Sequence, residues 1–307
     1  MSKKIIFPYL PFEEFVEEPL LKRLSLFYDE ILINEGRLNL NQSKINLAKL
    51  EALKKGEIFS NYGKATIDFL IQKNVIKTYP KFSEQSEPSP GIRELGLLLQ
   101  NNIMKFKEKK MSEPNLKTQI HNAYYSSHDI IARIDSLRFR ENDNLSEYYP
   151  LLRNYETLRT ESKKNQVIQF VLNDIPEPDL TTSWEQIIEY RSDENIKNKY
   201  LALINWINKT ANSNLKLSEI KDEYDYLYSE YMTQFKLHKM KYNNSSLEVI
   251  VNSTINFINN LQTGNYISSI KDLFQFKLKN AKLSLEESKL SGKEIAYIYH
   301  TKSKFLK

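Results

Sequence analysis

The hydrophobic pattern of this chain changes at one point, a turn at Ile175–Asp179 that contains two prolines. Before the turn, short apolar runs alternate with segments of helical periodicity, and that mixture predicts a small sheet with helices packed on it. After the turn the pattern is almost wholly helical. We therefore expect an α+β protein with two domains. Residues 1–180 form a small N-terminal α/β sheet domain with a helical insertion, and residues 181–307 form an antiparallel α-helical bundle.

A helix start is expected immediately after the turn. Ser183 and Gln186 have the spacing of a capping box, in which each side chain satisfies a free backbone amide, and such a cap contributes ~1 kcal/mol. Trp184, Ile187 and Ile188 then share one side of the helix, and charged residues occupy the remainder. An amphipathic helix of this kind needs a surface to pack on.

Short apolar runs in the first half predict strands over Lys4–Leu10, Glu30–Asn34 and Val75–Tyr79, and Gln166–Leu172 is interpreted as a strand that returns the chain to the same sheet. Helical periodicity predicts the following helices: Leu20–Tyr28, Asn61–Gln72 with Ile67, Leu70 and Ile71 inward, Leu95–Met111, and Leu116–Arg140. A polar, Pro-rich linker is expected over residues 81–93.

Three apolar stripes follow Trp184, each with spacings of mostly three and four residues. They are Ile196, Tyr200, Leu203, Ile204 and Ile207; Ile220, Tyr224, Leu227, Tyr231 and Phe235; and Leu247, Ile250, Val251, Ile255, Ile258 and Leu261. Ser245 with Glu248 offers a cap for the third helix, and Gly264 a stop. A further long helix, Tyr266–Leu290, is expected to end at Gly292.

Four short motifs carry a family resemblance. Ile5–Tyr9, Leu26–Ile31, Trp184–Arg191 and Gly292–Ile298 resemble, in order, the "YYPY", "LLYWDKI", "PWEQILEFR" and "GREIAYI" segments of a family of uncharacterised bacterial proteins. The chain departs from that pattern at Phe27 and Tyr28, which stand for Tyr-Trp, and at Lys293, which stands for Arg. The resemblance implies a soluble bacterial protein and supplies no catalytic residue.

Composition restricts the chemistry. The chain has no cysteine, which excludes disulfides, thiolate metal sites and cysteine nucleophiles and suits the reducing cytoplasm. We expect a cytoplasmic protein, because no run approaches the ~20 apolar residues that a membrane span requires and the start lacks the apolar region of a signal peptide.

Motifs for common reaction centres are missing from the sequence. It contains no phosphate-binding loop, dinucleotide-binding turn, nucleophile elbow or zinc-protease helix. We therefore expect no cofactor and no metal site, and the hypothesis that the protein is an enzyme is the less favoured one. His121 and His128 share a helix face, but two turns separate them by ~10 Å along the axis. Asp129 or Asp135 could add a carboxylate, but that distance is too long for one metal ion without help from another segment.

Asp29 and Glu30 are the strongest catalytic alternative, because they lie where the first helix meets the second strand. Glu294 near the C-terminal end, with Lys293 beside it, would complete an acidic and basic group of the kind used in metal-dependent phosphodiester hydrolysis. Acidic residues at strand ends are more often solvated or paired with lysine or arginine. A metal-dependent nuclease or related hydrolase therefore remains an alternative function.

Tyrosines crowd the second stripe. Tyr224, Tyr226, Tyr228, Tyr231 and Tyr242 cannot all bury their hydroxyl groups without partners, so some rings are expected at the surface. Packing at the rim of the core is the main interpretation. Exposed tyrosine also favours protein interfaces, and we predict partner contacts at Tyr224, Tyr228, Tyr231 and Trp184.

The positive charge is concentrated at the C-terminal end. From Lys271 to Lys307 there are nine lysines and four acidic residues, a balance equal to the whole-chain charge of +5. The favoured interpretation is a solvated helix face. Contact with phosphate or an acidic surface through Lys277, Lys279, Lys282 and Lys289 is a further alternative, which would make the chain a nucleic-acid-binding module.

The leading expectation is a non-catalytic subunit or adaptor of a bacterial multi-protein complex. Such a protein acts through contacts with other protein subunits, and antiviral defence is a setting that the accessory character of the resembled family favours. The sequence leaves the oligomeric state open.

Overall fold

The computed structural model describes most of the chain in nine segments. These are residues 2–8, 17–35, 65–80, 82, 88–108, 116–153, 161–237, 286–287 and 289–306. Two compact units, Met1–Ile187 and Ile188–Lys307, are described one at a time. None of the helices in these segments combines the length and apolar character that crossing a bilayer requires.

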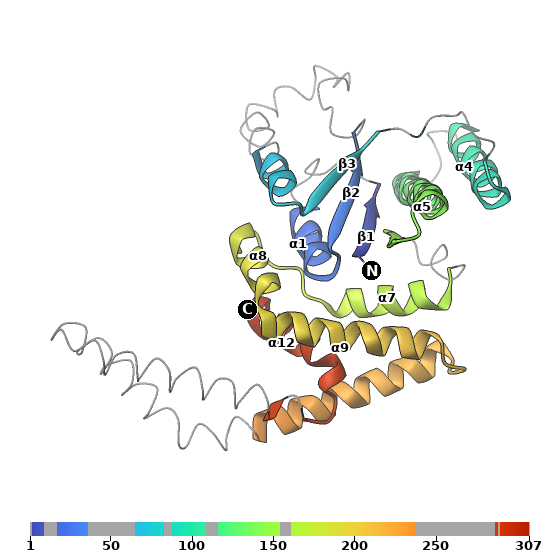
Figure 1. The fold of residues 1–307 in the computed structure, drawn as a ribbon. Coiled ribbons are helices and arrows are strands. Elements are labelled where there is room, and N and C mark those ends of the chain that lie inside the picture. Colours follow the sequence, from blue (N-terminus) through green and yellow to red (C-terminus); the bar gives the residue numbers. More distant parts are fainter. Residues whose placement is uncertain are drawn as a thin grey trace. The chain divides into compact units, whose positions relative to one another are not determined.

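A small sheet organises the first unit (Figure 1). Its strands are β1 (Ser2–Phe7), β2 (Glu30–Asn34), β3 (Ile76–Tyr79) and β4 (Ser146–Pro150), in the spatial order β3-β2-β1-β4. Each described strand pair is parallel. The protein is thus of mixed α/β class. A parallel sheet needs cover on both faces, which explains the continuous apolar run in β1 and β2.

Helices lie on both faces of this sheet. Ile6, Leu32 and Tyr148 point to one face, where Ala132 of helix α5 (Leu116–Asn142) packs on them. Side chains alternate along a strand, so Tyr149 points to the opposite face, and its ring lies 5.9 Å from that of Tyr28. Helix α1 (Glu17–Phe27) covers β2 on that side, and α7 (Lys163–Asp174) packs beside α1 (Figure 1).

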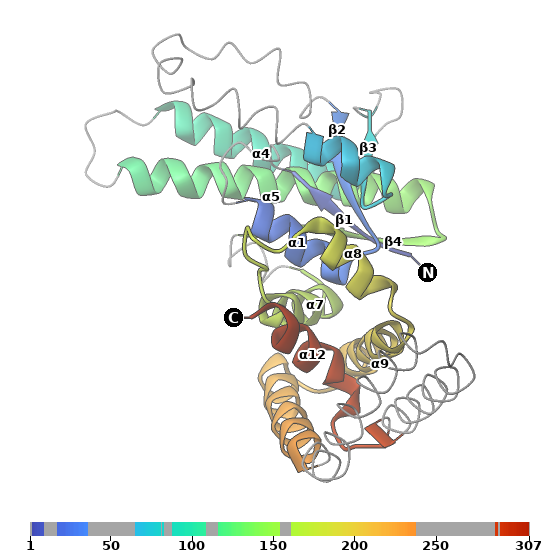
Figure 2. The same ribbon diagram turned by 90° about the vertical axis from the view of Figure 1, so that its left-hand side faces the viewer.

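Helix α4 (Pro90–Glu108) forms an antiparallel pair with α5. Gly91 faces Leu137 and Asn102 donates a hydrogen bond to Ser126, so one helix runs forward as the other runs back. Proline fits the first position of a helix because the amide it lacks has no partner there. Figure 1 shows α5 between α4 and the sheet, so α4 forms an outer layer, and Figure 2 shows the two helices running side by side.

Several predictions for the first unit need correction. Gln166–Leu172 is not a strand, because Ser162 accepts a hydrogen bond from the Asn165 amide and starts helix α7 there. The fourth strand of the sheet is instead β4, which pairs with β1 on the side away from β2 and which the sequence pattern did not reveal. The predicted linker ends before residue 93, since α4 begins at Pro90. Helix 65–72 buries Ile67 and Leu70 but leaves Ile71 exposed.

The predicted capping box is confirmed at the start of helix α8 (Trp184–Ser192). The Ser183 amide donates to Gln186 Oε1 at 3.1 Å, and the Gln186 amide donates to Ser183 Oγ at 3.2 Å. Trp184 and Ile187 are buried, as the amphipathic pattern requires. Lys22 of α1 lies 5.8 Å from the Trp184 ring, a cation–π contact within the first unit.

Helices make up the second unit as described. They include the end of α8, α9 (Glu194–Ala211), a helix over residues 217–237, the short η4 (Lys293–Ile295) and α12 (Ala296–Phe305). The first two predicted stripes bury Leu203, Ile204, Ile220 and Tyr231 as expected. The third stripe, the Ser245–Glu248 cap, Gly264 and most of Tyr266–Leu290 lie outside the described residues.

Gly292 allows the C-terminal segment to turn closely against residues 217–237. Its φ is +74°, and a Cβ atom there would lie 2.2 Å from the Leu227 carbonyl oxygen. Only glycine adopts this conformation at so close an approach without strain.

Candidate functional site

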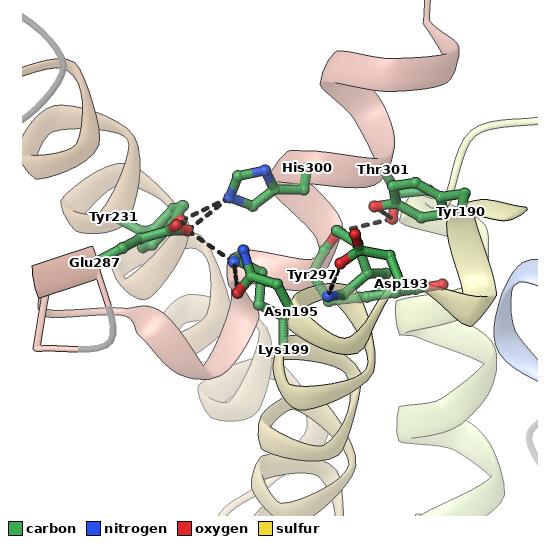
Figure 3. A network of polar contacts seen from close by, with 10 residues as sticks. Tyr190, Asp193, Asn195, Lys199, Tyr231, Glu287, Tyr297, His300 and Thr301 are labelled. Carbon is green, nitrogen blue, oxygen red and sulfur yellow. Dashed lines mark hydrogen bonds and ion pairs between the residues drawn. The ribbon is translucent and has the colours of Figure 1, made fainter. Parts of the chain in front are cut away.

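A buried polar cluster in the second unit centres on Glu287 (Figure 3). His300 of α12 approaches Glu287 Oε1 with its Nε2 at 2.7 Å, and Lys199 of α9 approaches with its Nζ at 3.3 Å. The Tyr231 hydroxyl, from the helix over residues 217–237, donates to the same oxygen. A carboxylate only accepts hydrogen bonds, so three donors from separate elements converge on one atom.

The cluster holds Glu287 in its charged form. Burial by itself would raise the pKa of this carboxyl, but hydrogen bonds from His300 and Tyr231, together with the charge on Lys199, lower it to about 2. Burial and the hydrogen bond to Glu287 raise the pKa of Tyr231 above its usual value. The cluster therefore combines a carboxylate with a neutral phenol across the physiological range.

Its geometry favours a structural role over a chemical one. Lys199 is itself buried, and its ammonium also donates to Asn195 Oδ1 at 2.7 Å. Beside the cluster, the Tyr190 hydroxyl lies 3.0 Å from Thr301 Oγ1, and that hydroxyl donates to the Tyr297 carbonyl oxygen (Figure 3). These polar groups use their hydrogen-bonding capacity to join α8, α9 and α12 to each other.

The predicted carboxylates of the first unit are engaged in the sheet. Asp29 Oδ2 accepts from the Lys3 amide at 2.7 Å, and Glu30 pairs with Lys77 at 2.6 Å and with Lys4 at 3.5 Å. Both acidic residues lie at the amino end of β2, whereas ligands of parallel sheets bind beyond the carboxyl ends. This location weakens the catalytic alternative for Asp29 and Glu30.

Glu294 belongs to η4 in the second unit and is half-buried. The structure does not determine where Glu294 lies relative to Asp29 and Glu30. The hypothesis that these three carboxylates act together therefore stays a prediction. Among the described residues, no group of three or more His, Cys, Asp or Glu side chains is placed to hold a metal ion.

The aromatic side chains predicted to contact partners are mostly inside the chain. Trp184, Tyr224 and Tyr231 are buried, and Tyr228 is half-buried with Lys302 Nζ at 4.8 Å from its ring centre. Their own unit already supplies the packing that an interface would provide. Tyr226 is the exposed tyrosine of this helix, at 61 %. The partner contacts predicted for Trp184, Tyr224, Tyr228 and Tyr231 stay a prediction. Tyr242 lies outside the described residues.

Of the predicted phosphate-contacting lysines, Lys289 is exposed at the surface. Lys277, Lys279 and Lys282 lie outside the described residues. The nucleic-acid alternative therefore stays a prediction without a described surface to support it.

The outward side of α4 carries an unexpected group of exposed apolar residues. Leu97 and Met104 lie on the side opposite to the buried Ile92 and Leu95 and are 58 % and 51 % exposed. Leu98 and Ile103 flank them and are also exposed. We call Leu97, Leu98, Ile103 and Met104 the α4 apolar group. A helix with apolar residues all round is typical of a buried helix, yet this one forms an outer layer.

Signals for both features were present in the sequence. No charged residue occurs from Leu95 to Met104, which is unusual for a surface helix. Lys199 falls on the apolar side of α9, one turn before Leu203, so it had to find a buried acidic partner. The sequence did not indicate which acidic residue would pair with Lys199, because Glu287 lies far along the chain.

A scan against protein-family models, a search of curated proteins and a search of solved structures each found no match.

Proposed function

We propose that this protein is a non-catalytic subunit or adaptor that works through protein contacts and that its contact surface is the outward side of α4. The observation that carries the proposal is the exposure of the α4 apolar group on a stretch of helix without charge. Contiguous exposed apolar residues mark interaction sites, whereas single ones are ordinary surface. Pairing of polar groups within the chain, as at Glu287 and Glu30, supports the same conclusion.

The finer architecture is part of this proposal. A separate N-terminal sheet domain would present α4 on the α5 layer, and an antiparallel bundle would form the C-terminal domain. The setting in a bacterial multi-protein system, such as antiviral defence, rests on the motif resemblance alone. A cytoplasmic location is supported by the absence of cysteine.

The test is the assembly state of the full chain in its native cells. A Leu97→Ser, Met104→Ser double variant should lose the larger complex that the wild-type chain forms, because each exposed anchor contributes ~2 kcal/mol or more to an interface. Native mass spectrometry of the tagged chain measures this. Leu201→Ser is the matched control, since Leu201 of α9 is equally exposed, at 56 %, but lies in the other unit. A double variant that assembles like the wild type would contradict the proposal.

A further inference from the structure

We infer that the chain binds a phosphate-bearing small molecule beyond the carboxyl ends of β1 and β4 and that Arg153 holds the phosphate. The site belongs to the first unit alone, and the α4 apolar group takes no part in it. Three observations support the site: the order of the strands, the faces of the sheet that α1 and α5 cover, and the contacts that fix Arg153.

The order of the strands reverses at β1. The chain passes from β1 through α1 to β2 on one side, and from β3 through α4 and α5 to β4 on the other side. Right-handed crossovers in opposite directions place their helices on opposite faces of a sheet, and α1 and α5 do cover opposite faces (Figure 1). In such sheets, ligands bind beyond the carboxyl ends of the two strands between which the order reverses. Here these strands are β1, which ends at Phe7, and β4, which ends at Pro150.

Arg153 follows the end of β4 by three residues and is held by α5 at two points. Its amide donates to Asp129 Oδ1 at 3.0 Å, and Asp129 is completely buried. Its guanidinium carbon lies 4.7 Å from the centre of the Tyr125 ring, one turn before Asp129 on α5. A buried carboxylate thus fixes the backbone of Arg153, and a cation–π contact holds its charged end. The residue is nevertheless exposed, so a dissolved ligand can reach it.

The chemistry of arginine fits a phosphate at this place. A guanidinium presents a rigid fork of donors that matches two phosphate oxygens, and it always carries its charge. Arg153 has a further interaction within the chain, but five N–H donors allow it to serve a protein group and a ligand together. The sequence from Pro8 to Val16, after β1, contains no glycine. Phosphate binding by the backbone of a glycine-rich turn is therefore not available there, and a side chain supplies the donors.

Asn34 at the end of β2 indicates the size of the ligand. Side chains alternate along a strand, so Asn34 points to the same face as Leu32, on which Ala132 of α5 packs. The strands β2 and β4 lie on the two sides of β1, ~10 Å apart. A ligand that reaches from Arg153 to Asn34 must be longer than free phosphate, and a nucleotide has that length.

The first experiment is isothermal titration calorimetry of the purified full-length chain with ATP, AMP and inorganic phosphate. The nucleotides should bind, and more tightly than inorganic phosphate. Arg153→Gln should weaken binding roughly 10- to 100-fold, because it removes charge-assisted hydrogen bonds. Arg153→Lys should weaken it less, since the charge remains and only the fork is lost.

Two control variants accompany the titration. Arg138→Gln removes the same charge from α5, where the Arg138 guanidinium lies 5.2 Å from the Phe82 ring, and it should leave binding unchanged. Leu97→Ser with Met104→Ser should also bind like the wild type, because the site does not involve α4. Circular dichroism of Arg153→Gln should match that of the wild type, since the changed side chain is exposed.

The second experiment locates the ligand on the wild-type chain. Phenylglyoxal modifies arginine side chains, and mass spectrometry of peptides measures the rate at each arginine. Saturating ATP should slow the modification of Arg153 and leave that of Arg138 unchanged.

Each outcome decides the inference. A wild-type chain that binds none of the three probes at millimolar concentration overturns it. Binding that Arg153→Gln leaves unchanged, or protection of other arginines in place of Arg153, overturns it as well. Inorganic phosphate that binds as tightly as the nucleotides would keep Arg153 as the phosphate site and contradict the contact with Asn34.

Discussion

The Glu287 cluster and the outward side of α4 are opposite cases of a residue type in an unusual environment. Glu287 and Lys199 are charged and buried, whereas Leu97 and Met104 are apolar and exposed. The cluster has the residue types of a reaction centre, but its groups satisfy one another within the unit. The α4 residues have no chemistry to offer, but no described packing uses them. The support for the proposed contact function is therefore an exposed apolar surface that no described contact covers. The presence of charged and aromatic residue types in the Glu287 cluster does not by itself indicate a function.

The largest effect that this comparison predicts is on stability at Glu287. Glu287→Ala should lower the free energy of unfolding by about 3–5 kcal/mol, because it leaves the buried Lys199 without its acidic partner. Urea unfolding measures the loss. Glu185→Ala, at an exposed position of α8, is the control and should change stability by less than about 0.5 kcal/mol. An equally small effect at Glu287 would break the structural interpretation of the cluster.

Acid should reproduce much of that effect. The pKa of Glu287 is about 2 in the folded chain, below its ordinary value of 4.5. Its stabilising contribution, on the order of 3 kcal/mol, is therefore complete above pH 4.5 and is lost as the pH falls from 4.5 through about 2. The stability difference between wild type and Glu287→Gln should shrink over this range. A difference that stays constant down to pH 2 would contradict the lowered pKa.

Two glycines, one near the Glu287 cluster and one in α4, allow the two regions to be compared through the backbone. Gly292→Ala should cost at least about 2 kcal/mol, since its φ of +74° disfavours a side chain and the Cβ would collide with the Leu227 carbonyl. Gly96 in α4 has nothing within 4 Å of the added atom, so Gly96→Ala should stabilise the chain by about 0.5–1 kcal/mol. Thermal unfolding of the two variants measures these opposite changes. Equal effects would show that the C-terminal segment does not turn as described.

The smallest effect on function is expected for the alternative catalytic residues. Asp29→Asn combined with Glu294→Gln should leave the native assembly and biological function intact and cost about 1 kcal/mol, mainly at the hydrogen bond from the Lys3 amide to Asp29. The measurement is biological function in cells, scored together with the mass of the native complex, for the variant and for the wild type. Loss of function in a folded variant that still assembles would favour the hydrolase alternative over the adaptor.

Local signals in the sequence identified several elements correctly. The apolar runs of β1, β2 and β3, the periodicity of α5 and the Ser183–Gln186 cap all depend on residues close in the chain, and each is found in the structure. Where such signals conflicted, the prediction failed. The apolar run over Gln166–Leu172 fits a strand or a helix, and only the Ser162 cap distinguished them. Pro90 was interpreted as part of a linker although proline also starts helices.

By itself, then, the sequence determined the mixed α/β character, the inward sides of α9 and of residues 217–237, and the positions where α8 begins and Gly292 turns. Periodicity, capping and backbone freedom act over a few residues, so they can be read along the chain. Tertiary structure alone decided that β4 joins β1, that Glu287 meets Tyr231, Lys199 and His300, and that Leu97 and Met104 face outward on α4. Those outcomes depend on contacts between residues far apart in the chain, and no local preference specifies which distant partner a residue will meet.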